Sequence, residues 1–228
     1  MIYVLSGFFF GLLIPYIARR FAKFMPATMA GAIYWLIIPG KKVSKQKRSG
    51  NIKYRRLMHK YIICAIVWGI ICAALTFVVE MCLPSMFFVA HVWLLLLLYE
   101  IDERMFLLPD ILTVPLLITG FVYASTLPAG ECIYYSPAFN SAVGAAAGYI
   151  LPVIASLLMV KKYPDAFGGG DIKLLSAVGA WVGFPLVPIL LLLSSIVFAL
   201  FCLVKRERSG AFGPAIVIAT LILAFFVI

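Results

Sequence analysis

The chain contains 228 residues, of which 64% are hydrophobic and 12% are charged. Soluble domains carry about 25% charged residues, so this composition excludes an ordinary soluble domain and predicts a polytopic membrane protein. The net charge of +10 raises the alternative of a nucleic-acid-binding protein. Twelve of the nineteen Lys and Arg residues lie between positions 19 and 60, however, and such clusters are typical of cytoplasmic loops. We therefore expect contact with membrane lipid and none with nucleic acid.

The apolar segments predict an all-α fold of about eight transmembrane helices. The first, over residues 1–17, has no basic region before it and no A-x-A-like cleavage site after it, which favours a retained span over a signal peptide. Residues 18–60 form a basic loop, in which the short apolar stretch 29–40 suits the membrane interface. Residues 61–228 form the membrane-embedded domain. Its predicted spans are residues 61–79, 83–99, 111–127, 139–160, 174–182, 185–204 and 212–228.

Two of these segments have unusual glycine patterns. Residues 174–182 are too few to cross a bilayer, which takes about 20 residues, so we expect a half-helix. It follows the sequence GGGD at 168–171 and ends near the helix-breaking GFP at 183–185. The sequence GAAAG at 144–148 has small residues four apart, which predicts that its helix approaches a neighbour closely.

The basic residues also predict the topology. With eight spans and the N-terminus outside, the inside loops are residues 18–60, 100–110, 161–173 and 205–211. These four loops contain all nineteen Lys and Arg residues, whereas the outside loops carry only Glu80 and Glu131. Because basic residues mark cytoplasmic loops, we expect both termini outside.

Carboxylates in or near a membrane are candidates for a functional role, because placing an Asp at the centre of a spanning helix costs about 2.5–3.5 kcal/mol of insertion free energy. Six candidate carboxylates lie on the predicted cytoplasmic side: Glu100, Asp102, Glu103, Asp110, Asp165 and Asp171. For Glu103 and Asp165 we expect an ordinary place in a hydrated loop.

Asp171 differs from the others because three glycines precede it and an apolar segment follows. Glycine permits positive φ and close approach of another backbone. A carboxylate at a helix start also meets free N–H groups and the positive end of the helix dipole. The local sequence therefore leaves two roles open for Asp171, a helix cap and a catalytic group.

Asp102 favours the catalytic role. It lies 69 residues before Asp171 but on the same predicted face of the membrane. Two carboxylates brought together do not both ionise easily, so one keeps a proton while the other acts as base towards a water molecule. Such a pair can hydrolyse a peptide bond. The sequence leaves open which of the two holds the proton.

These residues resemble a known family. GGGD at 168–171 matches the G-x-G-D motif of intramembrane aspartic proteases. The blocks IDERMFLLPD at 101–110 and GDIKLLSAVGAWVG at 170–183 resemble the bacterial type IV prepilin peptidases. The runs GAAAGY at 144–149 and FGPAI at 212–216 also resemble patterns of that family, so the similarity extends from about residue 99 to the C-terminus. In that family the first catalytic Asp stands eight residues before the Asp of an L-P-D, which corresponds here to Asp102 and Asp110. G-x-G-D alone is weakly specific, whereas two blocks at this spacing are a specific signal.

The resemblance implies an aspartic endopeptidase of the bacterial inner membrane. Such enzymes cut the basic leader from type IV prepilins or type II secretion pseudopilins at the cytoplasmic face. The resemblance implies that the cleavage needs no cofactor. Carried onto this sequence, the catalytic residues are Asp102 and Asp171, the active-site loop is Gly168, Gly169 and Gly170, and the supporting residues are Asp110 and Lys173. For Lys173 a simpler role is also open, in which its ammonium group snorkels to the interface.

One feature departs from the family pattern. Many members carry two zinc-binding C-x-x-C pairs in the first cytoplasmic loop, which is associated with N-methylation of the new N-terminus. Residues 18–60 contain no cysteine, so we expect no metal and a peptidase without methyltransferase activity. Cys82 and Cys132 both fall in predicted outside loops, where a disulfide between them is an option.

Two other classes of function stay open. In a transporter or channel, the half-helix would line an ion path. Against this, no inverted repeat is visible and both aspartates lie at one face. The other class is a non-catalytic pilus assembly factor. A serine protease or metalloprotease is not expected, because the sequence has neither G-x-S-x-G nor H-E-x-x-H. The lone His91 is expected to be a packed core residue.

Overall fold

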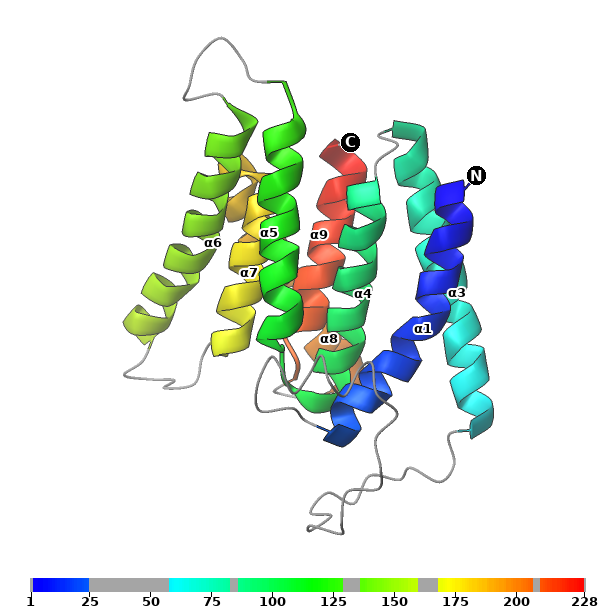
Figure 1. Cartoon of the computed structure of the whole chain (residues 1–228). Coiled ribbons are helices and arrows are strands. Elements are labelled where there is room, and N and C mark those ends of the chain that lie inside the picture. The colour runs from blue at the N-terminus through cyan, green and yellow to red at the C-terminus, as the bar shows by residue number, and fades with distance from the viewer. Residues whose placement is uncertain are drawn as a thin grey trace.

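Figure 1 shows the computed structural model of the chain, in which every regular element of the described residues is helical. The structure describes residues 2–24, 58–82, 86–128, 136–159, 168–206 and 210–227. The predicted interfacial stretch 29–40, Asp165, and the pairing of Cys82 with Cys132 lie outside what it describes.

Eight α-helices of the described residues form a bundle, and each coincides with one predicted segment. They are α1 (Ile2–Phe24), α3 (Met58–Cys82), α4 (Met86–Met105), α5 (Asp110–Thr126), α6 (Pro137–Met159), α7 (Gly169–Val182), α8 (Val187–Lys205) and α9 (Gly213–Val227). A short 3-10 turn, Phe184–Leu186, joins α7 to α8. Both termini lie at the same end of the bundle (Figure 1), as an even number of crossings requires.

The surface of the bundle has the apolar character of a membrane protein. Two helical stretches of the described residues, Pro137–Leu158 and Phe184–Lys205, are long and apolar enough to cross a bilayer. Shorter apolar helices are Val4–Arg19, Cys64–Phe77, Asp110–Thr126 and Gly213–Ala224. Leu157 and Leu203 are 66% and 73% exposed, where a soluble protein would place polar groups. The number of eight spans stays a prediction.

The helix α7 occupies the interior of the bundle, between α5 and α6 in Figure 1. Seven consecutive residues, 174–180, are buried, so α7 is covered on all sides. This buried stretch is almost entirely apolar, as is typical of a helical segment with no exposed face. With 14 residues it is about 21 Å long, shorter than the roughly 30 Å hydrocarbon layer. The short helix is therefore confirmed.

The predicted start of α7 at residue 174 is wrong by five residues. The helix begins at Gly169, so Asp171 lies within its first turn. Glycines in a helix cost only about 1 kcal/mol each, which tertiary packing easily outweighs. The helix ends at Val182, and its C-cap Gly183 has a φ of 79°, which favours glycine. The N–H of Phe184 donates to Asn140 Oδ1 on α6 at 3.0 Å.

The close packing predicted for GAAAG is confirmed. A Cβ atom added at Gly144 would lie 2.3 Å from the Gly179 carbonyl oxygen on α7. A Cβ at Gly148 would lie 2.4 Å from the Leu175 carbonyl oxygen. The backbones of α6 and α7 therefore touch, and only glycine fits at these contacts.

The predicted loop 100–110 is also partly wrong, because α4 continues six residues past the predicted end at residue 99. Glu100 and Asp102 are 6% and 4% exposed on this helix, rather than hydrated in a loop. Burial of Glu100 is tolerated because its carboxylate accepts hydrogen bonds from Arg104 and, at 3.2 Å, from Trp68 Nε1 on α3. As expected, His91 is a packed residue, 3% exposed, with its ring centroid 4.0 Å from that of Trp181.

Candidate active site

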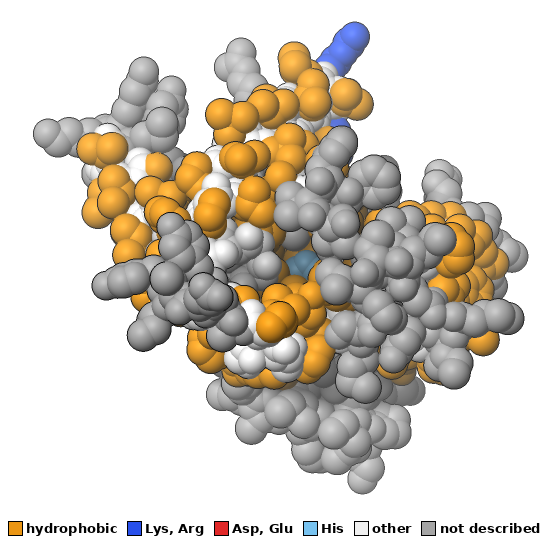
Figure 2. Space-filling view, turned by 90° about the horizontal axis from the view of Figure 1, so that it is seen from above, with side chains coloured by type: hydrophobic (Ala, Val, Ile, Leu, Met, Phe, Trp, Pro, Cys, Tyr) orange, Lys and Arg blue, Asp and Glu red, His pale blue; other side chains and the backbone are white. Residues whose placement is uncertain are grey.

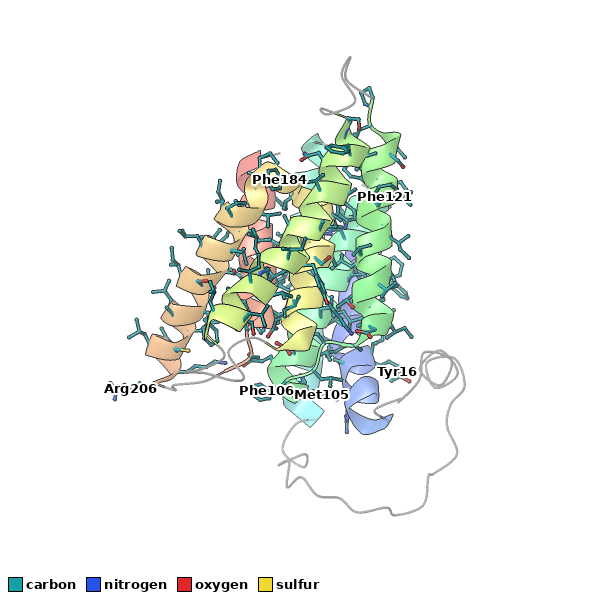
Figure 3. The ribbon with its side chains drawn as sticks, turned by 90° about the vertical axis from the view of Figure 1, so that its left-hand side faces the viewer. Tyr16, Met105, Phe106, Phe121, Phe184 and Arg206 are labelled. Carbon is teal, nitrogen blue, oxygen red and sulfur yellow. The ribbon has the colours of Figure 1, made fainter. Side chains whose placement is uncertain are left out.

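The five carboxylates whose side chains the structure describes gather at one end of the bundle. Figure 3 shows Met105, Phe106 and Arg206 at one end, with Phe121 and Phe184 towards the other. The last turns of α4 and the first turns of α5 and α7 meet at the first end and carry Glu100, Asp102, Glu103, Asp110 and Asp171. Figure 2 looks onto the opposite end, where most of the side chains drawn in colour are hydrophobic and none of them is acidic.

Asp102 lies on the last turn of α4 and is almost completely buried, with 4% exposure. Its Oδ2 accepts a hydrogen bond from the backbone N–H of Gly213, the first residue of α9, at 3.0 Å. A carboxylate held by a backbone N–H at a helix start is stabilised by that bond and by the positive end of the helix dipole.

Asp171 is the third residue of α7, after the N-cap Gly168. Its carboxylate lies against the start of its own helix, because a Cβ atom added at Gly168 would lie 2.9 Å from Asp171 Oδ2. A place at the helix start is favourable for a carboxylate, and it leaves a catalytic role open as well. Asp171 is less buried than Asp102 and lies at the rim of the bundle.

The fold brings these two aspartates to one place. The charge of Asp102 acts electrostatically on Asp171. Helix α9 packs against both α4 and α7, which carry the two side chains. A Cβ added at Gly170 would lie 3.0 Å from Leu108 Cβ, in the connection between α4 and α5. The glycine loop and this connection are thus in close contact, which explains the need for glycine at 170.

The other two loop glycines differ from Gly170. A Cβ atom at Gly168 would lie 2.9 Å from Asp171 Oδ2, so a side chain there would press on the carboxylate. At Gly169 nothing lies within 4 Å. Contacts in the loop therefore restrict residues 168 and 170, and they leave space at 169.

Asp110 and Lys173 form an ion pair between the start of α5 and the first turn of α7. Lys173 Nζ lies 2.7 and 2.8 Å from the two carboxylate oxygens of Asp110. The ammonium group of Lys173 lies at the exposed end of the bundle, which is compatible with the snorkelling role, and it binds Asp110 there. The two side chains are 49% and 57% exposed, so the pair adds at most about 1 kcal/mol to stability. Its geometry ties the turn that carries Asp171 to α5.

Two further ion pairs hold the same end of the bundle. Lys205 Nζ at the end of α8 binds Glu103 Oε1 on α4 at 2.5 Å. Glu103 is therefore exposed, but it lies on a helix and forms an ion pair, whereas the sequence predicted an ordinary place in a hydrated loop. Arg104 binds Glu100 within α4. Among the ion pairs of the described residues, none includes Asp102 or Asp171.

This arrangement suits general acid–base chemistry by two carboxyl groups. Asp102 and Asp171 face no cation among these ion pairs, so either can hold or release a proton. The described part of the chain contains no group of three or more His, Cys, Asp or Glu residues placed to hold a metal ion.

Sequence reasoning missed two contacts at the site. It noted the run FGPAI at 212–216 only as a resemblance and gave Gly213 no contact, although a glycine followed by proline after a short loop is a signal for a helix start. It also gave none to Leu108, whose place against Gly170 depends on tertiary packing that no local pattern encodes.

Comparison with known proteins places the site in a family. The model of the type IV leader peptidase family matches residues 88–203, which is half of the chain. The chain belongs to the type IV leader peptidase family. The leader peptidase match includes Asp102, Asp171 and the whole of α5, α6 and α7, whereas α1, α3 and α9 lie beyond it. Membership does not favour the transporter, channel or assembly-factor alternatives.

Several relatives carry the name prepilin leader peptidase/N-methyltransferase. The one from Aeromonas salmonicida is 40% identical over 137 residues, covering 56% of this chain and 44% of the relative. The one from Vibrio cholerae is 33% identical, covering 56% and 51%. The one from Legionella pneumophila is 35% identical, covering 62% and 50%. The chain thus spans about half the length of these relatives. No solved structure matches the chain.

Proposed function

We propose that the chain is a membrane aspartic endopeptidase that removes the basic leader from type IV prepilins or type II secretion pseudopilins. The observation that carries the proposal is the meeting of Asp102 and Asp171, 69 residues apart in sequence, at one end of the bundle. The leader peptidase family match and the names of the relatives support a prepilin precursor as the substrate.

The proposed reaction uses the two carboxyl groups as an acid and a base. One of Asp102 and Asp171 is ionised and takes a proton from water, whose oxygen attacks the carbonyl carbon of the scissile peptide bond. The other is protonated and gives its proton to the carbonyl oxygen, which yields a tetrahedral intermediate. As the intermediate collapses, the C–N bond breaks and the leaving nitrogen receives a proton from a carboxyl group. A carboxylic acid and an amine result, with no cofactor.

The fold suits a substrate that arrives at the end of the bundle. Asp102 is buried and Asp171 lies in the rim, so a peptide reaching the glycine loop meets Asp171 first. Gly169 has open space around it and offers room for an extended strand to lie along the backbone. A precursor that is cut just before its apolar helix could keep that helix in the lipid during cleavage.

The same proposal includes the membrane orientation. All nineteen basic residues fall in loops at one face of the eight-span map, and the site lies at that face, so we place the site at the cytoplasmic side of a bacterial inner membrane. Lipid surrounds the bundle, and the exposed leucines of α6 and α8 contact it.

Methyltransferase activity is not part of the proposal. The relatives are named for a peptidase and an N-methyltransferase. Residues 18–60 of this chain contain no cysteine, so the zinc-binding pairs that accompany methylation in the family have no counterpart there. We propose cleavage alone.

N-terminal sequencing tests this function. The chain is co-expressed with a candidate prepilin, and the N-terminus of the pilin is determined with and without the peptidase gene. A new N-terminus just before the apolar helix, present only with the peptidase, supports the proposal. The proposal is refuted if every prepilin and pseudopilin encoded in the same genome stays a full-length precursor in both cultures.

A further inference from the structure

The start of α9 meets Asp102 through one backbone group. The N–H groups of Ala215 and Ile216 both donate to the carbonyl oxygen of Phe212, at 3.0 and 3.2 Å. Pro214 has no N–H. Of the first-turn donors of α9, that of Gly213 is therefore the one left for another partner, and it donates to Asp102 Oδ2 at 3.0 Å in a buried setting.

The space at this contact admits only glycine. A Cβ atom at position 213 would lie 2.5 Å from Asp102 Oδ2, 3.0 Å from its Cγ and 3.2 Å from its Cβ. A separation of 2.5 Å is far below van der Waals contact. All three nearest atoms belong to the Asp102 side chain, and none belongs to the backbone. A methyl group at 213 would therefore displace the carboxylate and leave the helices where they are.

We propose that Gly213 is a positioning residue for the reaction. Its N–H fixes the rotation of the Asp102 carboxylate, and its missing side chain leaves the space that the carboxylate fills. The assignment rests on the proposed function, because it gives Gly213 a role in cleavage. It also goes beyond the leader peptidase match, which ends at residue 203. The start of α9 is thereby part of the site.

Two variants separate positioning from general stability. Gly213→Ala adds one methyl group against Asp102. Gly210→Ala adds the same methyl group in the same connection, where the nearest atom is Phe198 Cε2 at 3.9 Å. Both are measured as the full chain in detergent, with a prepilin that the parent chain cleaves. We expect Gly213→Ala to lower kcat at least about 100-fold, as misplacement of a reacting group by about 1 Å does, with KM within twofold. Gly210→Ala should match the parent.

Thermal unfolding tests the contact independently of cleavage. In the parent chain, Gly213→Ala should lower the Tm by a few degrees, because it breaks a buried hydrogen bond to a carboxylate. In an Asp102→Ala background the oxygen and Cγ are gone, so the same substitution should shift the Tm by less than half as much. The difference between the two shifts measures the coupling of residues 213 and 102.

The outcomes are distinguishable. If the parent cleaves and Gly213→Ala keeps its kcat, or raises KM alone, Gly213 is not a positioning residue. Equal Tm shifts in both backgrounds also overturn the proposal, because the methyl group then acts on something other than Asp102. If the parent cleaves no prepilin, the proposed function falls, and the unfolding cycle alone still decides whether Gly213 holds Asp102.

Discussion

The contact between α6 and α7 allows a quantitative prediction, because α7 carries Asp171. In Gly144→Ala, the new Cβ would lie 2.3 Å from the Gly179 carbonyl oxygen, whereas ordinary contact begins near 3.4 Å. The obstacle is backbone, so the two helices must separate locally by about 1 Å. Overpacking of this kind costs typically about 1–3 kcal/mol. For a chain of this length each kcal/mol lowers the Tm by about 2–4 °C, so we expect a loss of about 5 °C.

The assay is thermal unfolding of the full chain in detergent, followed by tryptophan fluorescence. Ala146→Val is the matched control, because residue 146 lies on the exposed side of the same helix and the substitution adds more volume than Gly144→Ala does. The control should unfold within about 1 °C of the parent, since its methyl groups point away from α7. If Gly144→Ala has the parent Tm, or if Ala146→Val is the less stable variant, the close approach of the two backbones is wrong.

Three further predictions concern charge, modification and orientation. Lys173→Met and Asp110→Asn should each lower cleavage less than about tenfold, because an exposed ion pair contributes at most about 1 kcal/mol; a loss as large as that of Asp171→Asn would give the pair a direct role. Mass spectrometry of the processed pilin should show an unmodified N-terminus, and a 14 Da increase that depends on this chain would contradict cleavage alone. In a cysteine-free background, Phe184→Cys should react with an impermeant thiol reagent added outside, and Arg206→Cys should not; the reverse pattern would invert the topology.

The sequence predicted most of the fold, because membrane helices are set by local hydrophobicity. Each of the eight predicted segments coincides with one helix, and the short α7 was found from its length and flanking glycines. Helix ends were less accurate. The first turn of α7 contains three polar or flexible residues, Gly169, Gly170 and Asp171, which no apolar pattern includes. The end of α4 contains Glu100 and Asp102, which are buried because Arg104 on the same helix, Trp68 on α3 and Gly213 on α9 satisfy them.

The site was predicted through motifs rather than through contacts. The sequence placed Asp102 and Asp171 at one face from the charge bias of the loops, and the structure brings them to the same end of the bundle. Their catalytic role stays a prediction. The partners of the site depend on tertiary packing, so the Asp110–Lys173 pair and the Gly213–Asp102 hydrogen bond could not be read from spacing along the chain.

The most direct test of the central claim is the cleavage rate of two isosteric variants. Asp102→Asn and Asp171→Asn keep the size of each side chain but remove its ability to take up and release a proton. Purified variants are compared with Glu103→Gln, which neutralises the neighbouring exposed carboxylate that binds Lys205. Each Asn variant should lower kcat/KM about 1,000-fold or more, while Glu103→Gln stays within a few-fold of the parent. Cleavage within tenfold of the parent by either Asn variant would contradict a two-aspartate mechanism.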